Sequence, residues 1–121
     1  MLEKVNLAEK LSKFPDHWHP RIVAQVNDCH VKLVKLRGEF VWHHHEHEDE
    51  LFLVLKGELL MRLRDGDVRV REGEFLVVPR GVEHLPVVES GEAHVLLFEP
   101  AGTLNTGSAG GDRTVERLEH I

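Results

Sequence analysis

Cysteine is almost absent from the sequence, which contains only Cys29 in 121 residues. A single cysteine cannot form a disulfide within the chain, so a disulfide-stabilised scaffold is excluded. Low cysteine usage is typical of proteins in the reducing cytoplasm, and we expect a cytoplasmic location. An isolated cysteine is far more often inert than catalytic, so we assign Cys29 no chemistry.

Long apolar runs and an excess of positive charge are also missing. No apolar stretch approaches the roughly 20 residues that a membrane-spanning helix needs, and no charged segment followed by an apolar one indicates a signal peptide. The 21 acidic residues outnumber the 15 basic ones, which gives a net charge of −6 at pH 7. The sequence therefore offers no basic face, and we expect neither nucleic acid nor a membrane as a partner.

The composition that remains is ordinary for one globular domain. Hydrophobic residues make up 41% of the sequence and charged residues 30%, and a chain of this length can enclose a single core. Changes in pattern divide the chain into three parts. We expect an N-terminal helix and arm at residues 1–20, a β-barrel at residues 21–99 and a C-terminal loop or tail at residues 100–121.

The two ends of the chain carry their own signals. Asn6, followed three residues later by Glu9, predicts the start of a short helix, and Pro15 stops it. Residues 100–112 are rich in glycine, serine and threonine, which predicts a surface loop. We expect residues 114–121 to form one last helical turn.

Residues 21–99 carry the period of β-strands. Apolar and polar side chains alternate, and turn signals recur roughly every 8 to 12 residues. Asp65-Gly66 is a strong two-residue hairpin signal, and Ser90-Gly91 marks a further turn. Many short strands without intervening helices predict an all-β sandwich or barrel.

Two of the predicted strands, at residues 51–55 and 93–98, are apolar on both faces. One face can fill the interior of a barrel. The other face needs cover, and a chain of this length has little to supply it. We therefore predict a homodimer.

The segment WHHHEHEDE, residues 42–50, contains four histidines and four acidic residues. Along a strand, residues i and i+2 point to the same side, so His43 and His45 project together while His44 points away. Two imidazoles on one face are half of a site for Zn, Fe, Ni, Mn or Cu. The segment itself can supply a carboxylate, from Glu46, Glu48, Asp49 or Glu50. A third imidazole must come from elsewhere.

A second segment can supply that imidazole. Gly73 is followed after five residues by Pro79, and Gly81 is followed after two residues by His84. A lone histidine after a Pro-x-Gly turn is weak evidence for a metal ligand. Beside the first cluster, however, His84 becomes a candidate for the missing one.

Together the two segments resemble the paired motifs of the cupin superfamily. The first motif is His-x-His, four residues, Glu, six residues and Gly, found here as His43, His45, Glu50 and Gly57. The second is Gly, five residues, Pro-x-Gly, two residues and His, found here as Gly73, Pro79, Gly81 and His84. The resemblance covers residues 31–99. Two positions depart from it: Gly38 has four residues before His43 where the family usually has five, and Val88 stands where an asparagine is common.

The resemblance implies a fold, a ligand set and a cofactor. The implied fold is the cupin double-stranded β-helix, a jelly-roll barrel with the metal inside its mouth. The implied metal ligands are His43, His45, Glu50 and His84, whereas His44 and His47 take no part. The cofactor would be one divalent transition metal per chain, with Fe, Zn, Ni and Mn as candidates.

Three functions are compatible with this ligand set. The first is a metal-dependent enzyme, dioxygenase-like, that acts on a small molecule. The second is a module that binds a small molecule or a metal without turnover. The third is a sugar-phosphate isomerase-like cupin, which would need a basic pocket. Several arginines could supply positive charge to such a pocket. They alternate with apolar residues along the predicted strands, so we interpret them as a solvated face: Arg62, Arg64, Arg69, Arg71 and Arg80.

Overall fold

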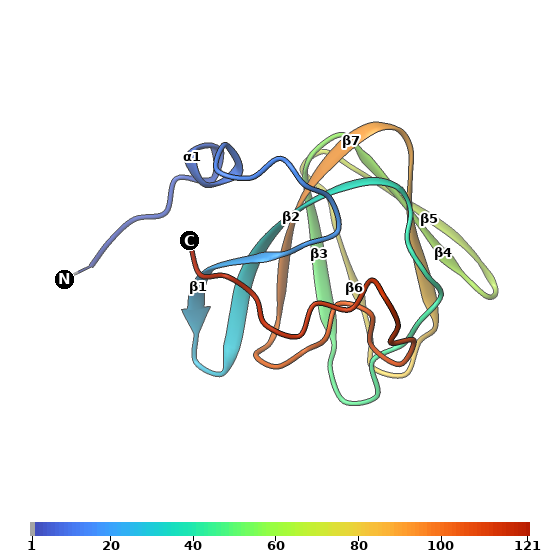
Figure 1. Ribbon diagram of the computed structural model, residues 1–121. Coiled ribbons are helices and arrows are strands. Elements are labelled where there is room, and N and C mark those ends of the chain that lie inside the picture. Colours follow the sequence, from blue (N-terminus) through green and yellow to red (C-terminus); the bar gives the residue numbers. More distant parts are fainter. Residues whose placement is uncertain (1) are drawn as a thin grey trace.

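A computed structural model describes residues 2–121 and shows an antiparallel barrel preceded by one short helix (Figure 1). The elements follow one another as α1 (Leu7–Leu11), β1 (Arg21–Val26), β2 (Cys29–Glu39), β3 (Glu50–Lys56), β4 (Glu58–Leu63), β5 (Gly66–Arg71), β6 (Phe75–Val78) and β7 (His84–Pro100). The all-β jelly-roll fold and the short N-terminal helix that the sequence predicts are therefore confirmed.

The long strand β7 holds the barrel together. Its second half pairs with β2 on one side and with β3 on the other, and its first half pairs with β4. The turn expected at Ser90-Gly91 is wrong, because the chain does not reverse there. It bends within one continuous strand, which arches over the top of the barrel in Figure 1.

The interior is filled by the side chains that alternate along the strands. Val34 of β2, Val54 of β3 and Val95 of β7 lie side by side in the pairing register and are at most 3% exposed. Leu59 and Met61 of β4 close the same core from the facing strand. Burying such side chains stabilises each by roughly 1.5–3 kcal/mol relative to exposure, so the barrel is a packed core with its opening at one end.

The N-terminal helix covers part of the outer face of the sheet. Asn6 Oδ1 accepts a hydrogen bond of 3.0 Å from the backbone N–H of Glu9, which is the predicted N-cap. Leu11 and Phe14 then pack against the outward side chain of Leu33. Within residues 2–121, no helix is long and apolar enough to cross a membrane.

The C-terminal segment crosses the barrel beside the ends of the strands (Figure 1). The helical turn expected at residues 114–121 is wrong. Instead, Ile22 N–H donates to Glu119 O at 2.8 Å, and Ile121 N–H donates to Ile22 O at 2.9 Å. The end of the chain thus adds to the edge of the sheet along β1. The backbone hydrogen bonds that a helix would have closed internally are made with a strand.

Candidate metal centre

Four buried side chains converge at one point of the barrel. One atom from each of His43, His45, Glu50 and His84 lies within 4.8 Å of the others. None of the four residues is more than 4% exposed. Glu50 is the first residue of β3 and His84 the first of β7, whereas the other two lie in the connection between β2 and β3. The structure therefore brings together the four residues that the cupin motifs indicate.

His43 and His84 are joined through their backbones. Each donates its N–H to the carbonyl oxygen of the other, at 3.1 and 2.9 Å. Their Nδ1 atoms lie 2.8 Å from Val41 O and 2.9 Å from Val82 O. A hydrogen on Nδ1 is thereby directed to a carbonyl, which leaves Nε2 of each ring with its lone pair toward the centre. This is the orientation and tautomer that a metal-binding imidazole requires.

His45 and Glu50 complete the cluster. His45 Nε2 lies 2.8 Å from Glu50 Oε1, and His84 Nε2 lies 3.3 Å from the same oxygen. Among residues 2–121, these three buried atoms have no hydrogen-bond partner of good geometry. Buried polar atoms without a partner are costly, by about 1–3 kcal/mol each. A cation at the centre would satisfy all three, so the residues present fit a metal ion.

The charge states of the cluster are also those of a ligand set. Burial lowers the pKa of His43 to about 4, and the neighbouring imidazole of His84 adds to the shift. Burial acts to raise the pKa of Glu50, but the facing imidazoles of His45 and His84 outweigh it and hold that pKa below its ordinary value. At neutral pH the centre therefore presents a neutral imidazole and an ionised carboxylate, as metal binding requires.

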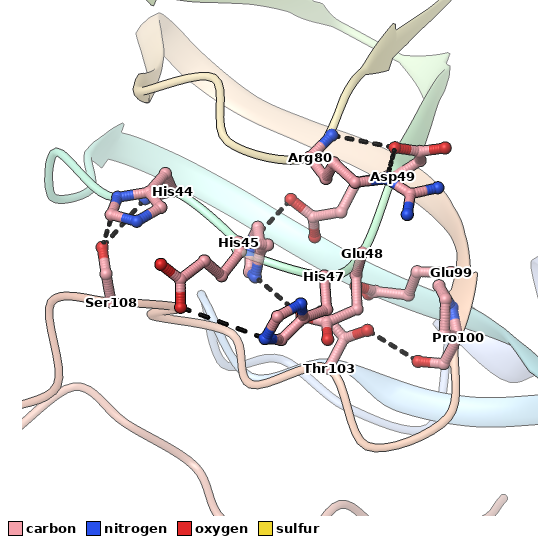
Figure 2. A network of polar contacts seen from close by, with 12 residues as sticks. His44, His45, His47, Glu48, Asp49, Arg80, Glu99, Pro100, Thr103 and Ser108 are labelled. Atoms are coloured by element: carbon pink, nitrogen blue, oxygen red, sulfur yellow. Dashed lines mark hydrogen bonds and ion pairs between the residues drawn. The ribbon is translucent and has the colours of Figure 1, made fainter.

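The other polar residues of the histidine-rich segment do not join the cluster. His44 Nδ1 lies 3.0 Å from Ser108 Oγ, and Figure 2 shows this ring turned to Ser108. His47 has a side chain that is 83% exposed. Asp49 accepts a hydrogen bond of 2.8 Å from the backbone N–H of Arg80 (Figure 2). Strand parity alone would have allowed His47 to join the cluster, whereas the motif spacing leaves it out, and in the structure it lies outside the cluster.

The cluster opens onto a cleft with apolar walls. The rings of Trp18 and Phe40 are stacked with centroids 4.7 Å apart and form one wall. Pro86 and Leu118 line the cleft as well, so strand, loop and C-terminal tail all contribute. The enclosed space is small, about 40 Å³ for the centres of water-sized spheres, and the cleft is partly open to solvent.

Two charged residues of this cleft were not predicted from the sequence. Lys32 and Glu99 are 2% and 3% exposed, and Lys32 Nζ lies 3.4 Å from Glu99 Oε1. Burial raises the pKa of Glu99 well above its ordinary value, and the charge of Glu50 adds to this, while Lys32 opposes it. Charged residues of β2 fall on both faces of the strand, and residues 93–98, next to Glu99, are apolar on both faces, so alternation did not reveal which charged residues point inward. Their inward direction follows only from the structure, in which Lys32 lies two residues before the inward-pointing Val34 and Glu99 two residues after the inward-pointing Leu97.

The tail lies directly against the cluster. A side chain at Gly107 would collide with the carbonyl oxygen of His44 and approach the ring of His43. Ser108 fixes this contact, because its N–H donates to His44 O at 2.9 Å and its Oγ accepts from His44 N–H at 3.1 Å. The part of the chain expected to be a surface loop therefore forms one side of the site.

Most of the arginines of β4 and β5 lie on the outer surface of the barrel. Trp42 beside them is half-buried, and the guanidinium of Arg64 lies 3.8 Å from its ring centroid. The interpretation of the arginines as a solvated face holds for β4 and β5, where Arg69 pairs with Glu58 and Glu89 on the exposed surface. None of these guanidinium groups lines the cleft.

Comparison with known proteins gives a consistent result. The cupin domain profile matches residues 30–99. Over 63 residues the chain is 43% identical to the uncharacterized protein YdbB of Bacillus subtilis (strain 168), a match that spans 51% of this chain and 56% of that relative. The chain thus matches little more than half the length of that curated relative.

Solved structures resemble the chain over a greater length. A cupin-2 domain containing protein from Shewanella frigidimarina is 44% identical, with a TM-score of 0.77, over 79% of this chain and 93% of that one. Protein NMB1881 from Neisseria meningitidis is 32% identical, with a TM-score of 0.74, over 82% of this chain and 100% of that one.

Proposed function

We propose that this chain, which belongs to the cupin domain family, holds one divalent transition metal at His43, His45, Glu50 and His84 and acts as an enzyme on a small molecule, in the manner of a dioxygenase. The observation that carries the proposal is the set of buried, unpartnered ligand atoms, among residues 2–121, at the inner end of an apolar cleft. A purely structural metal site would be closed, whereas this one faces space for a ligand.

The chemistry follows from the number of ligands. Three imidazoles and one carboxylate leave two positions on an octahedral ion, which can polarise a substrate oxygen or, when redox-active, bind O₂. The protein's own residues provide the setting. The carbonyls of Val41 and Val82 hold two imidazoles in one tautomer, and the stacked rings of Trp18 and Phe40 form an apolar wall on one side.

The alternatives differ in what they need from the cleft. A sugar-phosphate isomerase-like function requires a basic pocket for the phosphate, but within residues 2–121 Lys32 is the one lysine or arginine that lines the cleft, and it faces Glu99. A binding module without turnover needs the same metal and the same cleft as the enzyme. A turnover assay therefore separates the two functions that the cleft can serve.

The first experiment tests the metal. Folded protein binds the ion and unfolded chain does not, so a free metal concentration about 100 times the dissociation constant stabilises the fold by roughly 2.7 kcal/mol. For a chain of this size that corresponds to about 10 °C in melting temperature. We expect a chelator to lower the melting temperature of protein purified without added metal, and metal analysis to identify the ion.

Variants then locate the ion. Alanine at His43, His45, Glu50 or His84 should abolish the response to chelator, because each change removes a metal ligand. His44→Ala and His47→Ala are the matched controls from the same segment and should keep the response. Loss of the ion from His47→Ala, with its retention in His45→Ala or His84→Ala, would show that the ligand assignment is wrong.

Turnover is tested with the iron-loaded protein. We expect O₂ consumption, followed with an oxygen electrode, with a member of a panel of catechols, diketones and flavonols. The His84→Ala variant serves as the control for metal-independent oxidation. If iron is bound and no compound supports O₂ uptake above this control, the binding module becomes the better account.

A further inference from the structure

A buried charged pair lies in the cleft beside the candidate metal centre and is not part of it. Lys32 and Glu99 both line the cleft, together with His43 and Glu50 of the centre. Each of the two is less than 4% exposed. Desolvation offsets most of the attraction within a buried ion pair, so such a pair is weak evidence for a contribution to stability. A role in ligand binding is the alternative.

The pair is placed by the same alternation that builds the core. Lys32 continues the inward register of Val34 on β2, and Glu99 continues that of Leu97 on β7. Glu50 does the same at the start of β3. The end of β7 pairs with the starts of both β2 and β3. The three charged side chains therefore form one polar layer at the end of an otherwise apolar interior.

Among residues 2–121, one oxygen of the Lys32–Glu99 pair has no hydrogen-bond partner. Glu99 Oε1 faces Lys32 Nζ at 3.4 Å, whereas Oε2 is buried with no hydrogen bond of good geometry among residues 2–121, although the carboxyl group of Glu50 lies beside Glu99. The pair thus presents an ammonium group and a carboxyl oxygen side by side. A hydroxyl group matches both, because it can accept a hydrogen bond from Lys32 and donate one to Glu99.

We propose that Lys32 and Glu99 bind a hydroxyl group of the ligand, while an oxygen on the adjacent carbon faces the histidine cluster. This inference rests on the proposed function of the metal centre and names the ligand class for it. The ligand is a compact molecule with two oxygens on neighbouring carbons and an apolar body, as in a catechol.

Charge and shape both favour this class. At the Lys32–Glu99 pair itself, one ammonium group stands beside the carboxyl groups of Glu99 and Glu50, so a ligand carboxylate or phosphate placed there would meet more acidic groups than basic ones. The charge of the ion acts instead on the ligand oxygen that faces the histidine cluster. The walls made by Trp18 and Phe40 accept a flat apolar body. A neutral hydroxyl on an aromatic ring satisfies both conditions, and a sugar phosphate satisfies neither.

The test compares three probes by isothermal titration of the metal-loaded protein. Catechol carries two adjacent hydroxyls, phenol carries one, and benzoate carries a charged group on a ring of the same size. We expect wild-type protein to bind catechol at least about tenfold more tightly than phenol or benzoate, which is the effect of hydrogen bonds to charged groups. Lys32→Met, Glu99→Gln and the double variant should lose this preference while keeping their metal content.

The double variant keeps the test decisive, because it leaves no buried charge of the pair without its partner and should fold. A structural role alone would lower the melting temperature and leave the catechol preference unchanged, and that result overturns the inference. Tighter binding of benzoate, or equal binding of catechol and phenol by wild-type protein, overturns it too. Failure of the proposed function is a different result, namely wild-type protein that holds no metal before any probe is added.

Discussion

The buried imidazole of His43 gives the metal-free protein a pH dependence of its own. Its pKa is about 4 in the fold and about 6.5 in an unfolded chain. Between these values the unfolded chain takes up a proton that the folded protein does not, so the free energy of unfolding contributed by this group falls as the pH falls from 6.5 to 4. The groups that face it are His84, His45 and Glu50.

We predict that this loss amounts to about 3 kcal/mol across the window. It is measured by urea denaturation of chelator-treated protein at several pH values. His43→Gln cannot take up the proton, so its stability should fall less steeply than that of wild type. Parallel curves for the two proteins would contradict the assigned charge state.

Residue spacing predicted which four side chains converge, because local turns place them. The interval from His45 to Glu50 and the Pro79-Arg80-Gly81 turn before His84 each place a candidate ligand by short-range geometry. Lys32 and Glu99 could not be found in this way. Whether they point inward depends on the register between strands that are distant in the sequence, because charged residues fall on both faces of β2 and the residues before Glu99 are apolar on both faces.

At the scale of elements, the C-terminal tail should control access to the centre. Gly107 lies against His43 and His44 so closely that it has no room for a side chain, whereas Gly110, also with positive φ, has open space around it. We predict that Gly107→Ala displaces the tail and weakens metal binding several-fold. Gly110→Ala should have only the backbone effect, roughly 1 kcal/mol of stability, and leave the metal affinity unchanged.

The comparison is made by competition with a fluorescent chelator. Equal metal affinity in the two alanine variants would mean that the tail does not support the ligands. A difference confined to Gly107→Ala would mean that residues 100–112, which the sequence indicates only as a polar loop, belong to the site. Composition could not reveal this, because a loop packed on a surface and a loop packed on a site use the same small residues.

The strands themselves were predicted by alternation, but their continuity was not. The bend at Ser90-Gly91 has the composition of a turn, yet the backbone hydrogen bonds on either side of it go to β4 and to β2 and β3, so the strand continues. The last residues were expected to be helical and instead pair with Ile22. In both cases the deciding partner is far away in the sequence.

At the scale of the whole molecule, the outer face of β3 and β6 should be an interface between two copies of the chain. Leu51 pairs with Val77, and Leu53 with Phe75, so their outward side chains are neighbours. Phe75 is 63% exposed and Val77 45% exposed, although both are apolar. We predict a homodimer that covers this face, as the two-sided apolar strands suggest.

Sedimentation at micromolar concentration checks the assembly. Wild-type protein should sediment with twice the 13.8 kDa mass of the chain, and Phe75→Asp should be monomeric, because it places a charge in an apolar interface. Val68→Asp is the control, since Val68 is an exposed apolar residue of β5 outside this face. A monomeric wild-type protein contradicts the prediction.

The backbone bridge between His43 and His84 also bears on which ion the protein selects. Two of the candidate ligands are tied to each other by paired backbone hydrogen bonds, and each ring is held through its Nδ1 by a backbone carbonyl. A ring that swung outward to accept a larger ion would lose its contact with that carbonyl. A metal site with fixed dimensions selects among ions by their radius and preferred bond angles. A flexible site instead follows the intrinsic order of affinities, in which Cu²⁺ binds most tightly. Rigidity of this kind would allow a protein to hold a weaker-binding metal in the presence of a stronger one.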